Sequence, residues 1–290
     1  MSWLEALLLG LIQGLTEFLP VSSSGHLMIG QRLLGTELEG GEDLLFVVLV
    51  HAATVLATIV VFRKQIWGFL KDLFRFQYND GTDYILKIGL SMIPVMIVGL
   101  FFKDQVEALF SSMTVVGICL LVTALLLFLS DHYDTVKRLF LEGYAKGRGT
   151  PYEAVRKEAG DKKAPRNGIS WWQAFVIGLG QSLAVLPGLS RSGTTISTGL
   201  LSGVKRSEVA QFSFLMVLVP ILGEAFLDVL KGDIFSTQMG TLPLICGFVA
   251  AFVSGLFACR VMIALVKKAR LSWFALYCAL AGLLTLLLLA

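Results

Sequence analysis

Six runs of apolar residues, each long enough to cross a lipid bilayer, constrain this chain more than any other feature of its sequence. A spanning helix needs about 20 apolar residues, because a hydrocarbon core of about 30 Å is crossed at about 1.5 Å per residue. The runs are Leu44–Phe62, Tyr84–Phe102, Met113–Asp131, Glu208–Leu230, Leu242–Met262 and Trp273–Ala290. With 56% hydrophobic and 16% charged residues, the chain is too apolar for an ordinary soluble domain. We therefore predict an all-α polytopic membrane protein.

Two further apolar segments are interrupted by polar turns and are too short to cross as single helices. Trp3–Leu19 is followed, after Pro20 and three serines, by only Leu27–Leu34 before a group of acidic residues. Trp171–Leu186 followed by Thr194–Gly203 has the same shape. Irregular backbone is tolerated at membrane depth only where protein surrounds it. We predict that residues 3–34 and 171–203 form re-entrant helix-turn-helix hairpins whose tips meet inside the protein.

The two interrupted segments resemble each other at a constant offset of 168 residues. Gly10-Leu-Ile-Gln-Gly-Leu aligns with Gly178-Leu-Gly-Gln-Ser-Leu, and Ser22-Ser-Ser-Gly aligns with Ser190-Arg-Ser-Gly. Each half of the chain would then hold one hairpin and three spans. An odd number of spans inverts the second half, an arrangement typical of transporters. We predict a first inverted repeat over 1–131, a connector over 132–170 and a second repeat over 171–290.

The interrupting turns carry polar side chains that need a function at membrane depth. Gln13 and Glu17 are spaced to share one helix face, and intramembrane acids and cations are costly enough to indicate a site. His26 can exchange a proton near neutral pH, and the guanidinium fork of Arg191 suits a phosphate. Hydroxyls and glycines at the two helix starts favour an anion; they are Ser22, Ser23, Ser24, Gly25, Ser190, Ser192, Gly193 and Thr194.

Simpler roles remain open for several of these residues. Any single serine could only cap a short helix, and His26 could only bond a carbonyl group. His51 lies within the Leu44–Phe62 run, where a histidine either bridges helices or supports a neighbouring site.

Basic residues are distributed unevenly between the two faces that this topology creates. One face would receive 20 of the 24 lysines and arginines, nine of them in the 132–170 connector. By the positive-inside rule we expect 63–83, 132–170 and 263–272 to be cytoplasmic, with 103–112, 231–241 and both termini outside. The connector should lie on the anionic inner leaflet. The basic residues flank membrane segments rather than form an aromatic-interleaved patch, which argues against nucleic-acid binding.

Two long motifs resemble those of the bacterial undecaprenyl-diphosphatase (bacitracin-resistance) family. They are Gln13-Gly-Leu-Thr-Glu-Phe-Leu-Pro-Val-Ser-Ser-Ser-Gly-His26 and Pro187-Gly-Leu-Ser-Arg-Ser-Gly193, and the hydrophobic layout is similar over nearly the whole chain. The resemblance implies a multi-pass phosphatase of the bacterial cytoplasmic membrane, with its site open to the outside. It implies hydrolysis of undecaprenyl diphosphate to undecaprenyl phosphate and phosphate, which recycles the lipid carrier of peptidoglycan synthesis and confers bacitracin resistance.

Together with the resemblance, the residues suggest roles in such a reaction. Arg191 and the two serine-glycine turns would bind the diphosphate, Ser23 or a water would attack, and Glu17 with His26 would manage the proton. Many family members have glutamate where this chain has Gln13, so a metal site at Glu17 and Gln13 would have only one carboxylate. A divalent cation, Mg²⁺ or Ca²⁺, is compatible with that pair, whereas we expect no organic cofactor. The expected partners are the polyprenyl diphosphate and membrane lipid, and a homodimer is compatible with the sequence.

The alternative function is a lipid-phosphate flippase or transporter, because inverted repeats with broken helices are also the architecture of transporters. A purely structural membrane protein would leave both polar motifs unexplained.

Overall fold

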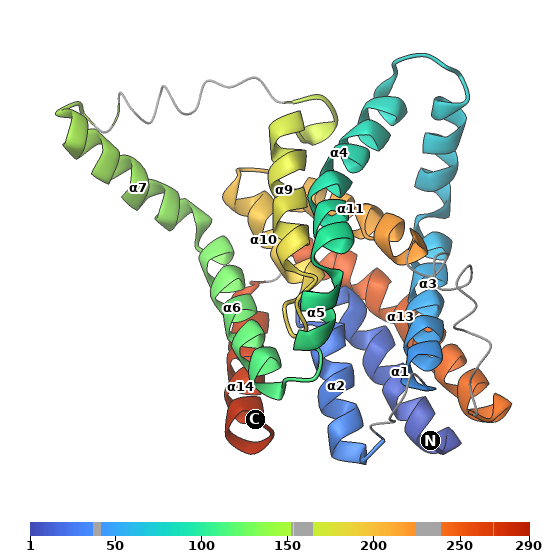
Figure 1. Ribbon diagram of the computed structural model, residues 1–290. Coiled ribbons are helices and arrows are strands. Elements are labelled where there is room, and N and C mark those ends of the chain that lie inside the picture. Colours follow the sequence, from blue (N-terminus) through green and yellow to red (C-terminus); the bar gives the residue numbers. More distant parts are fainter. Residues whose placement is uncertain (37–41, 152, 154–164, 224–238, 269) are drawn as a thin grey trace.

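The computed structural model describes residues 1–36, 42–151, 153, 165–223, 239–268 and 270–290, and within them the regular elements are helices (Figure 1). The first repeat and connector contain α1 (Trp3–Phe18), α2 (Ser23–Leu34), α3 (Glu42–Leu73), α4 (Asp80–Phe101), α5 (Lys103–Leu109), α6 (Met113–Asp131), α7 (Tyr133–Arg148) and the 3-10 turn η1 (Arg166–Gly168). The second contains α9 (Trp171–Leu183), α10 (Arg191–Leu201), α11 (Arg206–Met216), α13 (Thr241–Lys268) and α14 (Ser272–Leu288). The all-α prediction is confirmed.

Within the described residues, five helical segments are long and apolar enough to cross a membrane, which confirms a multi-pass architecture. α6 coincides with the predicted run, and α4 and α13 begin close to their predicted starts. The fourth run continues from α11 as helix to Gly223, whereas the rest of the predicted span, to Leu230, lies outside the described residues. The last run forms α14, which has 17 residues and is the shortest of the six.

α3 continues to Leu73, well beyond the predicted end at Phe62. Sequence reasoning ended this helix at Arg63 because the charged residues begin there. The helix continues because nothing between Arg63 and Leu73 breaks it, and long basic side chains can extend toward water from its end. The predicted loop 63–83 therefore begins as helix and contains only a short turn before α4.

Both interrupted segments are broken helices, as predicted. α1 and α2 are separated by residues 19–22, and α9 and α10 by residues 184–190. α1 and α9 begin with the same reciprocal capping interaction, formed by Ser2 with Glu5 and by Ser170 with Gln173. These pairs are also separated by 168 residues, so the local structures agree with the sequence alignment of the halves. The inverted relation of the two complete repeats stays a prediction.

The tips of the two broken helices meet in the middle of the molecule (Figure 1). The Ser192 hydroxyl donates to the Leu19 carbonyl at 3.1 Å. A Cβ at Gly25 would lie only 3.0 Å from the Gly188 Cα, so the two backbones touch there. Gly188 has a φ of 86° and packs against the Val116 carbonyl, a conformation and an approach that favour glycine. The prediction that the two tips lie side by side is confirmed.

Small residues allow α1 to pack closely against α13. A Cβ at Gly10 would collide with the Gly247 carbonyl, and a Cβ at Gly14 would collide with Ser254 and the Ala251 carbonyl. Helices in membranes associate through such small residues because lipid supplies no hydrophobic driving force between them. This contact occupies one side of α1 and leaves the face with Gln13 and Glu17 available to other helices.

A buried polar network joins α4 to the end of the connector. Lys87 and Asp83 form an ion pair at 2.6 Å in which each side chain is only 2% exposed. Lys87 also donates to the Arg166 carbonyl at 3.0 Å, and Asp83 accepts from Asn167 at 2.8 Å. Tyr78 donates to Asp83 at 2.6 Å, and this hydrogen bond raises the pKa of Tyr78. The network fixes the start of the second hairpin against the first half of the chain.

Candidate functional site

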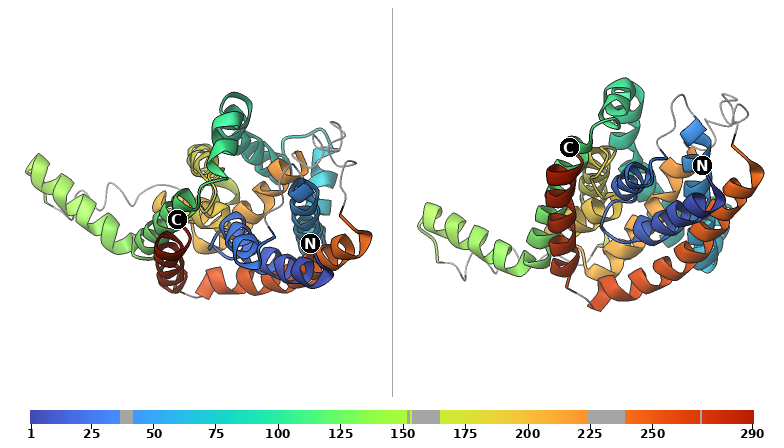
Figure 2. Two further views of the ribbon diagram at one scale, coloured as in Figure 1. Left: turned by 60° about the horizontal axis from the view of Figure 1, so that its bottom comes forward. Right: turned by 90° about the horizontal axis from the view of Figure 1, so that it is seen from below.

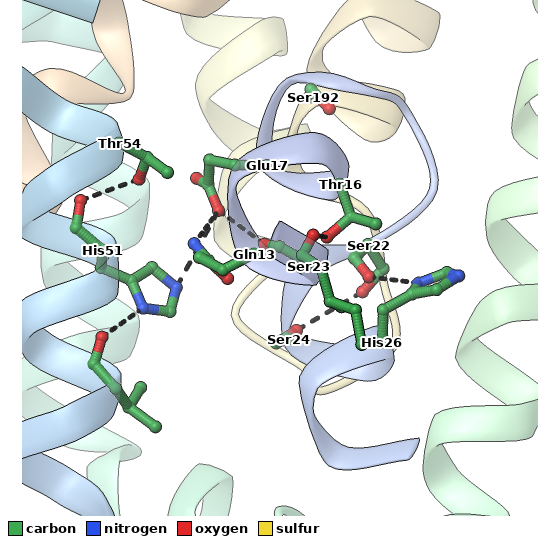
Figure 3. Close-up of polar contacts among 12 residues, drawn as sticks. Gln13, Thr16, Glu17, Ser22, Ser23, Ser24, His26, His51, Thr54 and Ser192 are labelled. Atoms are coloured by element: carbon green, nitrogen blue, oxygen red, sulfur yellow. Dashed lines mark hydrogen bonds and ion pairs between the residues drawn. The ribbon is translucent and has the colours of Figure 1, made fainter. Parts of the chain in front are cut away.

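A polar pocket lies where the two broken helices meet. It is lined by Glu17, Ser22, Ser23, Ser24, His51, Ala184, Leu189, Ser190, Arg191 and Ser192. Seven of the predicted site residues therefore surround one cavity, although they come from sequence segments far apart. Figure 3 shows the residues that the first hairpin and α3 contribute.

Glu17 is the centre of the hydrogen-bond network in this pocket. Its Oε2 accepts from the Ser23 hydroxyl at 2.6 Å and from the Gln13 amide at 2.8 Å (Figure 3). Gln13 is fully buried, and the side chain of Glu17 is 9% exposed. A carboxylate that accepts a short hydrogen bond from a serine hydroxyl is placed to take the proton of that serine.

His51 approaches the same carboxylate from α3. Its Nε2 lies 3.9 Å from Glu17 Oε2, and its Nδ1 lies 2.8 Å from the Val47 carbonyl (Figure 3). Since a carbonyl oxygen can only accept, Nδ1 must carry a proton and donate it. Nε2 is therefore the nitrogen that can exchange a proton with the pocket.

The turn that presents Ser23 is strained, whereas the matching turn before Arg191 is not. Ser22 has a φ of 73°, which is uncommon for any residue except glycine, and Ser190 has a φ of −66°. A residue in such a conformation costs on the order of 1–3 kcal/mol, and strain of this kind is concentrated at functional sites. The caps are otherwise equivalent, since Ser22 accepts from the Gly25 N–H and Ser190 accepts from the Gly193 N–H. The two glycine N–H groups are thus used in capping.

Arg191 supplies positive charge at the pocket through its guanidinium group. Its Nη1 is buried and has no hydrogen-bond partner among the described residues. Arg191 is the first residue of α10, and Ser23 is the first residue of α2, so two helix N-termini are located at the pocket. Helix N-termini carry partial positive charge and free backbone N–H groups. The arrangement is typical of an anion-binding site.

A second, mainly apolar pocket adjoins the polar one. Both are lined by Glu17, Arg191 and Ser192. The apolar pocket is also lined by Phe18, Thr54, Val55, Thr58, Ser213, Phe214, Val217 and Ile221. A ligand whose charged head occupies the polar pocket would have apolar side chains next to that head.

The structure does not bring all the predicted residues to the polar pocket. The His26 ring is directed away from Glu17 (Figure 3). Its Nε2 lies 2.7 Å from the Tyr277 hydroxyl of α14. Its Nδ1 donates to the Ser22 carbonyl at 2.7 Å, so His26 contacts the strained turn from behind. The acid–base role of His26 stays a prediction, because the hydrogen bonds of its ring are with Ser22 and Tyr277 and not with Glu17. Thr194 is buried, its hydroxyl has no partner in the described part of the chain, and it does not line the pocket.

Sequence reasoning left His51 unassigned, although it is the histidine that lies beside Glu17. The available signal was an ionisable residue inside an apolar run. Because helix periodicity shows which residues share a face but not which neighbouring helix that face meets, this signal could not connect His51 with Glu17.

The oxygen atoms near Glu17 allow one divalent cation but do not form a complete site for it. Among the described residues there is no group of three or more His, Cys, Asp and Glu that could hold a metal ion. The Gln13 Oε1 is buried and unpaired, so Glu17 and Gln13 could supply two oxygen ligands. Mg²⁺ commonly binds one or two carboxylates and takes its other ligands from water and substrate phosphates. The residues therefore fit an ion that is bound together with a phosphorylated substrate.

Comparison with known proteins connects this site with one family. Residues 6–284 match the family model described as bacitracin resistance protein BacA. Proteins named undecaprenyl-diphosphatase are similar along the whole chain. The one from Bacteroides thetaiotaomicron is 51% identical over 98% of this chain and 97% of its own length. The one from Parabacteroides distasonis is 52% identical over 99% and 98%, respectively. A relative from Carboxydothermus hydrogenoformans is 35% identical over 99% of this chain and 98% of its own length.

Proposed function

This chain belongs to the bacitracin resistance protein BacA family, and from that premise we propose that it hydrolyses undecaprenyl diphosphate to undecaprenyl phosphate and inorganic phosphate. One observation carries the proposal. A single pocket holds Ser23, which is hydrogen-bonded to the Glu17 carboxylate, and Arg191, whose buried Nη1 has no hydrogen-bond partner among the described residues. A serine and a carboxylate at 2.6 Å form a nucleophile and its base, and the arginine matches a phosphate.

The polar pocket and the apolar side chains beside it match the two parts of this substrate in chemical character. The diphosphate would lie among the serines, Arg191 and the two helix N-termini, while the first isoprene units would contact Phe18, Phe214 and Ile221. Since the apolar pocket lies among helices of a membrane protein, the remaining chain would stay in lipid. This division accounts for a catalytic site built at membrane depth.

The reaction would proceed through attack of Ser23 Oγ on the terminal phosphorus. Glu17 accepts the serine proton and passes it to the bridging oxygen as the bond from the phosphorus to that oxygen breaks, so undecaprenyl phosphate leaves and Glu17 is again a carboxylate. Arg191 and the helix N-termini stabilise the negative charge of the transferring group. A water then attacks the phosphoserine with Glu17 as its base, which releases phosphate and restores the hydroxyl.

We also propose that Glu17 and Gln13 hold one Mg²⁺ or Ca²⁺ when the diphosphate is bound. When bound, the ion supplies positive charge that reduces repulsion between the Glu17 carboxylate and the substrate. Gln13 keeps Glu17 in place through its amide, which donates to Oε2 at 2.8 Å.

The membrane would be the bacterial cytoplasmic membrane, with the site open to its outer side, where the released carrier can be recycled for peptidoglycan synthesis. The flippase alternative receives no support from the relatives, whose names describe a phosphatase. Both ends of the chain lie on the same side of the molecule, which the predicted topology requires in either orientation (Figure 1).

Phosphate release by the purified protein tests the proposal, with Ser23→Ala as the decisive variant. We expect Ser23→Ala to lower the rate by about a thousandfold or more, because loss of a nucleophile removes the covalent route. Ser24→Ala is the matched control: it removes the same hydroxyl one residue away, from a side chain with no hydrogen bond to Glu17, and should cost much less. No hydrolysis by the wild-type protein would refute the function. Normal hydrolysis by Ser23→Ala would instead mean that water attacks directly.

A further inference from the structure

We propose that α7 is a membrane-surface helix that binds an anionic lipid leaflet beside the transmembrane bundle. The helix follows α6 directly and leaves the bundle sideways, which is visible in all three views (Figures 1 and 2). Its main contact with another helix is with α6. The proposal concerns a surface that the catalytic reaction does not use.

One face of α7 combines aromatic and basic residues. Tyr133, Lys137, Phe140, Tyr144 and Arg148 follow each other at helical spacing and so share a face. Phe140 is 72% exposed and Tyr144 is 46% exposed, although both are large and apolar in body. Lys137 lies over the Tyr133 ring and Arg148 over the Tyr144 ring, at 5.8 and 5.2 Å from the ring centroids. Aromatic rings with adjacent cations are typical of the interface between lipid and water.

The opposite face of α7 is suited to water. Arg138 and Glu142 form an exposed ion pair there at 3.1 Å. Glu142 lies two residues after Phe140, which places the two side chains on opposite sides of the helix. α7 is therefore amphipathic. Its aromatic face does not pack against the bundle, since Phe140 is 72% exposed.

Charge identifies anionic lipid as the partner. α7 has four basic and two acidic residues, and the 132–170 connector as a whole has nine and five. Juxtamembrane basic residues are attracted to an anionic leaflet. A second copy of this chain would present the same positive charge to α7, so charge does not favour a dimer contact at this face.

Site-directed spin labels can measure which side of α7 is in lipid. Phe140→Cys and Glu142→Cys would be prepared in a background without the four native cysteines, and thermal unfolding would confirm that each variant is folded. In phosphatidylglycerol vesicles, the ratio of oxygen to water-soluble nickel-chelate accessibility should be several-fold higher at position 140 than at position 142. In phosphatidylcholine vesicles this difference should shrink.

Three results would overturn the proposal. Equal exposure to water at positions 140 and 142 in anionic vesicles would mean that α7 does not lie on the membrane. Shielding at position 140 together with spin-spin broadening that disappears on dilution with unlabelled protein would mean that a second copy covers it. Equal shielding in both kinds of vesicle would remove anionic lipid as the preferred partner.

Discussion

At the scale of residues, the short distance between Glu17 and His51 predicts that the two side chains handle protons together. Because His51 Nδ1 donates to Val47, a neutral His51 would direct the lone pair of Nε2 toward the carboxylate 3.9 Å away. Since Nε2 faces the carboxylate, we expect His51 to take over a proton that Glu17 accepts from Ser23. We therefore expect the pair to act as one unit.

A double-mutant cycle distinguishes this unit from the one suggested by sequence. We expect Glu17→Gln and His51→Gln each to slow phosphate release, and their combination to be little worse than the worse single variant. Glu17→Gln combined with His26→Ala should instead multiply the two losses, since His26 contacts the Ser22 carbonyl and not Glu17. The measurement is kcat/KM for a detergent-solubilised prenyl diphosphate. A multiplicative result for Glu17 with His51 would disprove their coupling.

Arg191 should not be replaceable by lysine. The guanidinium can bind two phosphate oxygens in one plane, whereas an ammonium group offers a single point charge on a flexible chain. We expect Arg191→Lys to lower phosphate release on the order of a hundredfold, and Arg191→Ala to lower it further. Arg206→Lys is a control, because Arg206 binds Asp131 at 2.6 Å outside the pocket. A rate for Arg191→Lys close to that of the wild type would show that charge alone is sufficient.

Much of the site could be predicted because its residues are anomalous in apolar sequence. Glu17 and Arg191 are charges at membrane depth, and the serines adjoin helix breaks, so their chemistry was apparent without coordinates. The choice between His26 and His51 could not be made in this way. It depends on which face of α2 meets α14 and which face of α3 meets α1, and these are properties of tertiary packing.

At the scale of elements, the buried pair of Lys87 and Asp83 should control how firmly the second hairpin is held. Lys87→Met would leave the Asp83 carboxylate buried without its cation, at a cost of about 3–5 kcal/mol. We expect a clearly lower midpoint of thermal unfolding in detergent. Replacing both residues, as in Lys87→Met with Asp83→Leu, should be less harmful than Lys87→Met alone.

The matched control is Lys103→Met on α5, where the ion pair with Glu107 has side chains that are 52% and 61% exposed. Exposed pairs contribute at most about 1 kcal/mol, so the midpoint should change little. Equal shifts for Lys87→Met and Lys103→Met would contradict a stabilising role for the buried pair.

The elements that sequence reasoning missed were those outside the apolar runs. α7 and the last part of α3 lie in polar sequence, where the pattern for a membrane span gives no signal. The broken helices were predictable because proline and serine interrupt an apolar pattern at the same offset twice. Which tip residues touch was not predictable, because it depends on Gly25 and Gly188 approaching closely enough for backbone contact.

At the scale of the whole molecule, the two hairpins enter from opposite ends and divide the work of the site. The first contributes Ser23 and Glu17, and the second contributes Arg191, so neither half contains both the proposed nucleophile and the cation. The second hairpin is held at the tips by Ser192 and Leu19 and at its base by the Lys87 network. Assembly of the pocket therefore depends on the two halves docking.

The orientation of this assembly in the membrane follows from the distribution of charge. The turn between α3 and α4 and the end of α7 lie at one end of the molecule, whereas both termini lie at the other (Figure 1). Since the predicted topology assigns 20 of the 24 lysines and arginines to the face that includes this end, we expect it to face the cytoplasm. Residues 103–112 should face outward; of the other predicted outer segment, 231–238 lie outside the described residues.

Single-cysteine labelling in a background without native cysteines tests this orientation. Thr150→Cys and Ser111→Cys place one thiol beyond each expected side of the membrane, and both positions are exposed. In intact spheroplasts, a membrane-impermeant maleimide should label Ser111→Cys at once and Thr150→Cys only after permeabilisation. We expect this pattern because the connector, with its nine basic residues, costs more free energy to move across the bilayer than the short segment around α5. Rapid labelling of Thr150→Cys from outside, with Ser111→Cys protected, would reverse the orientation and place the opening of the site on the cytoplasmic side.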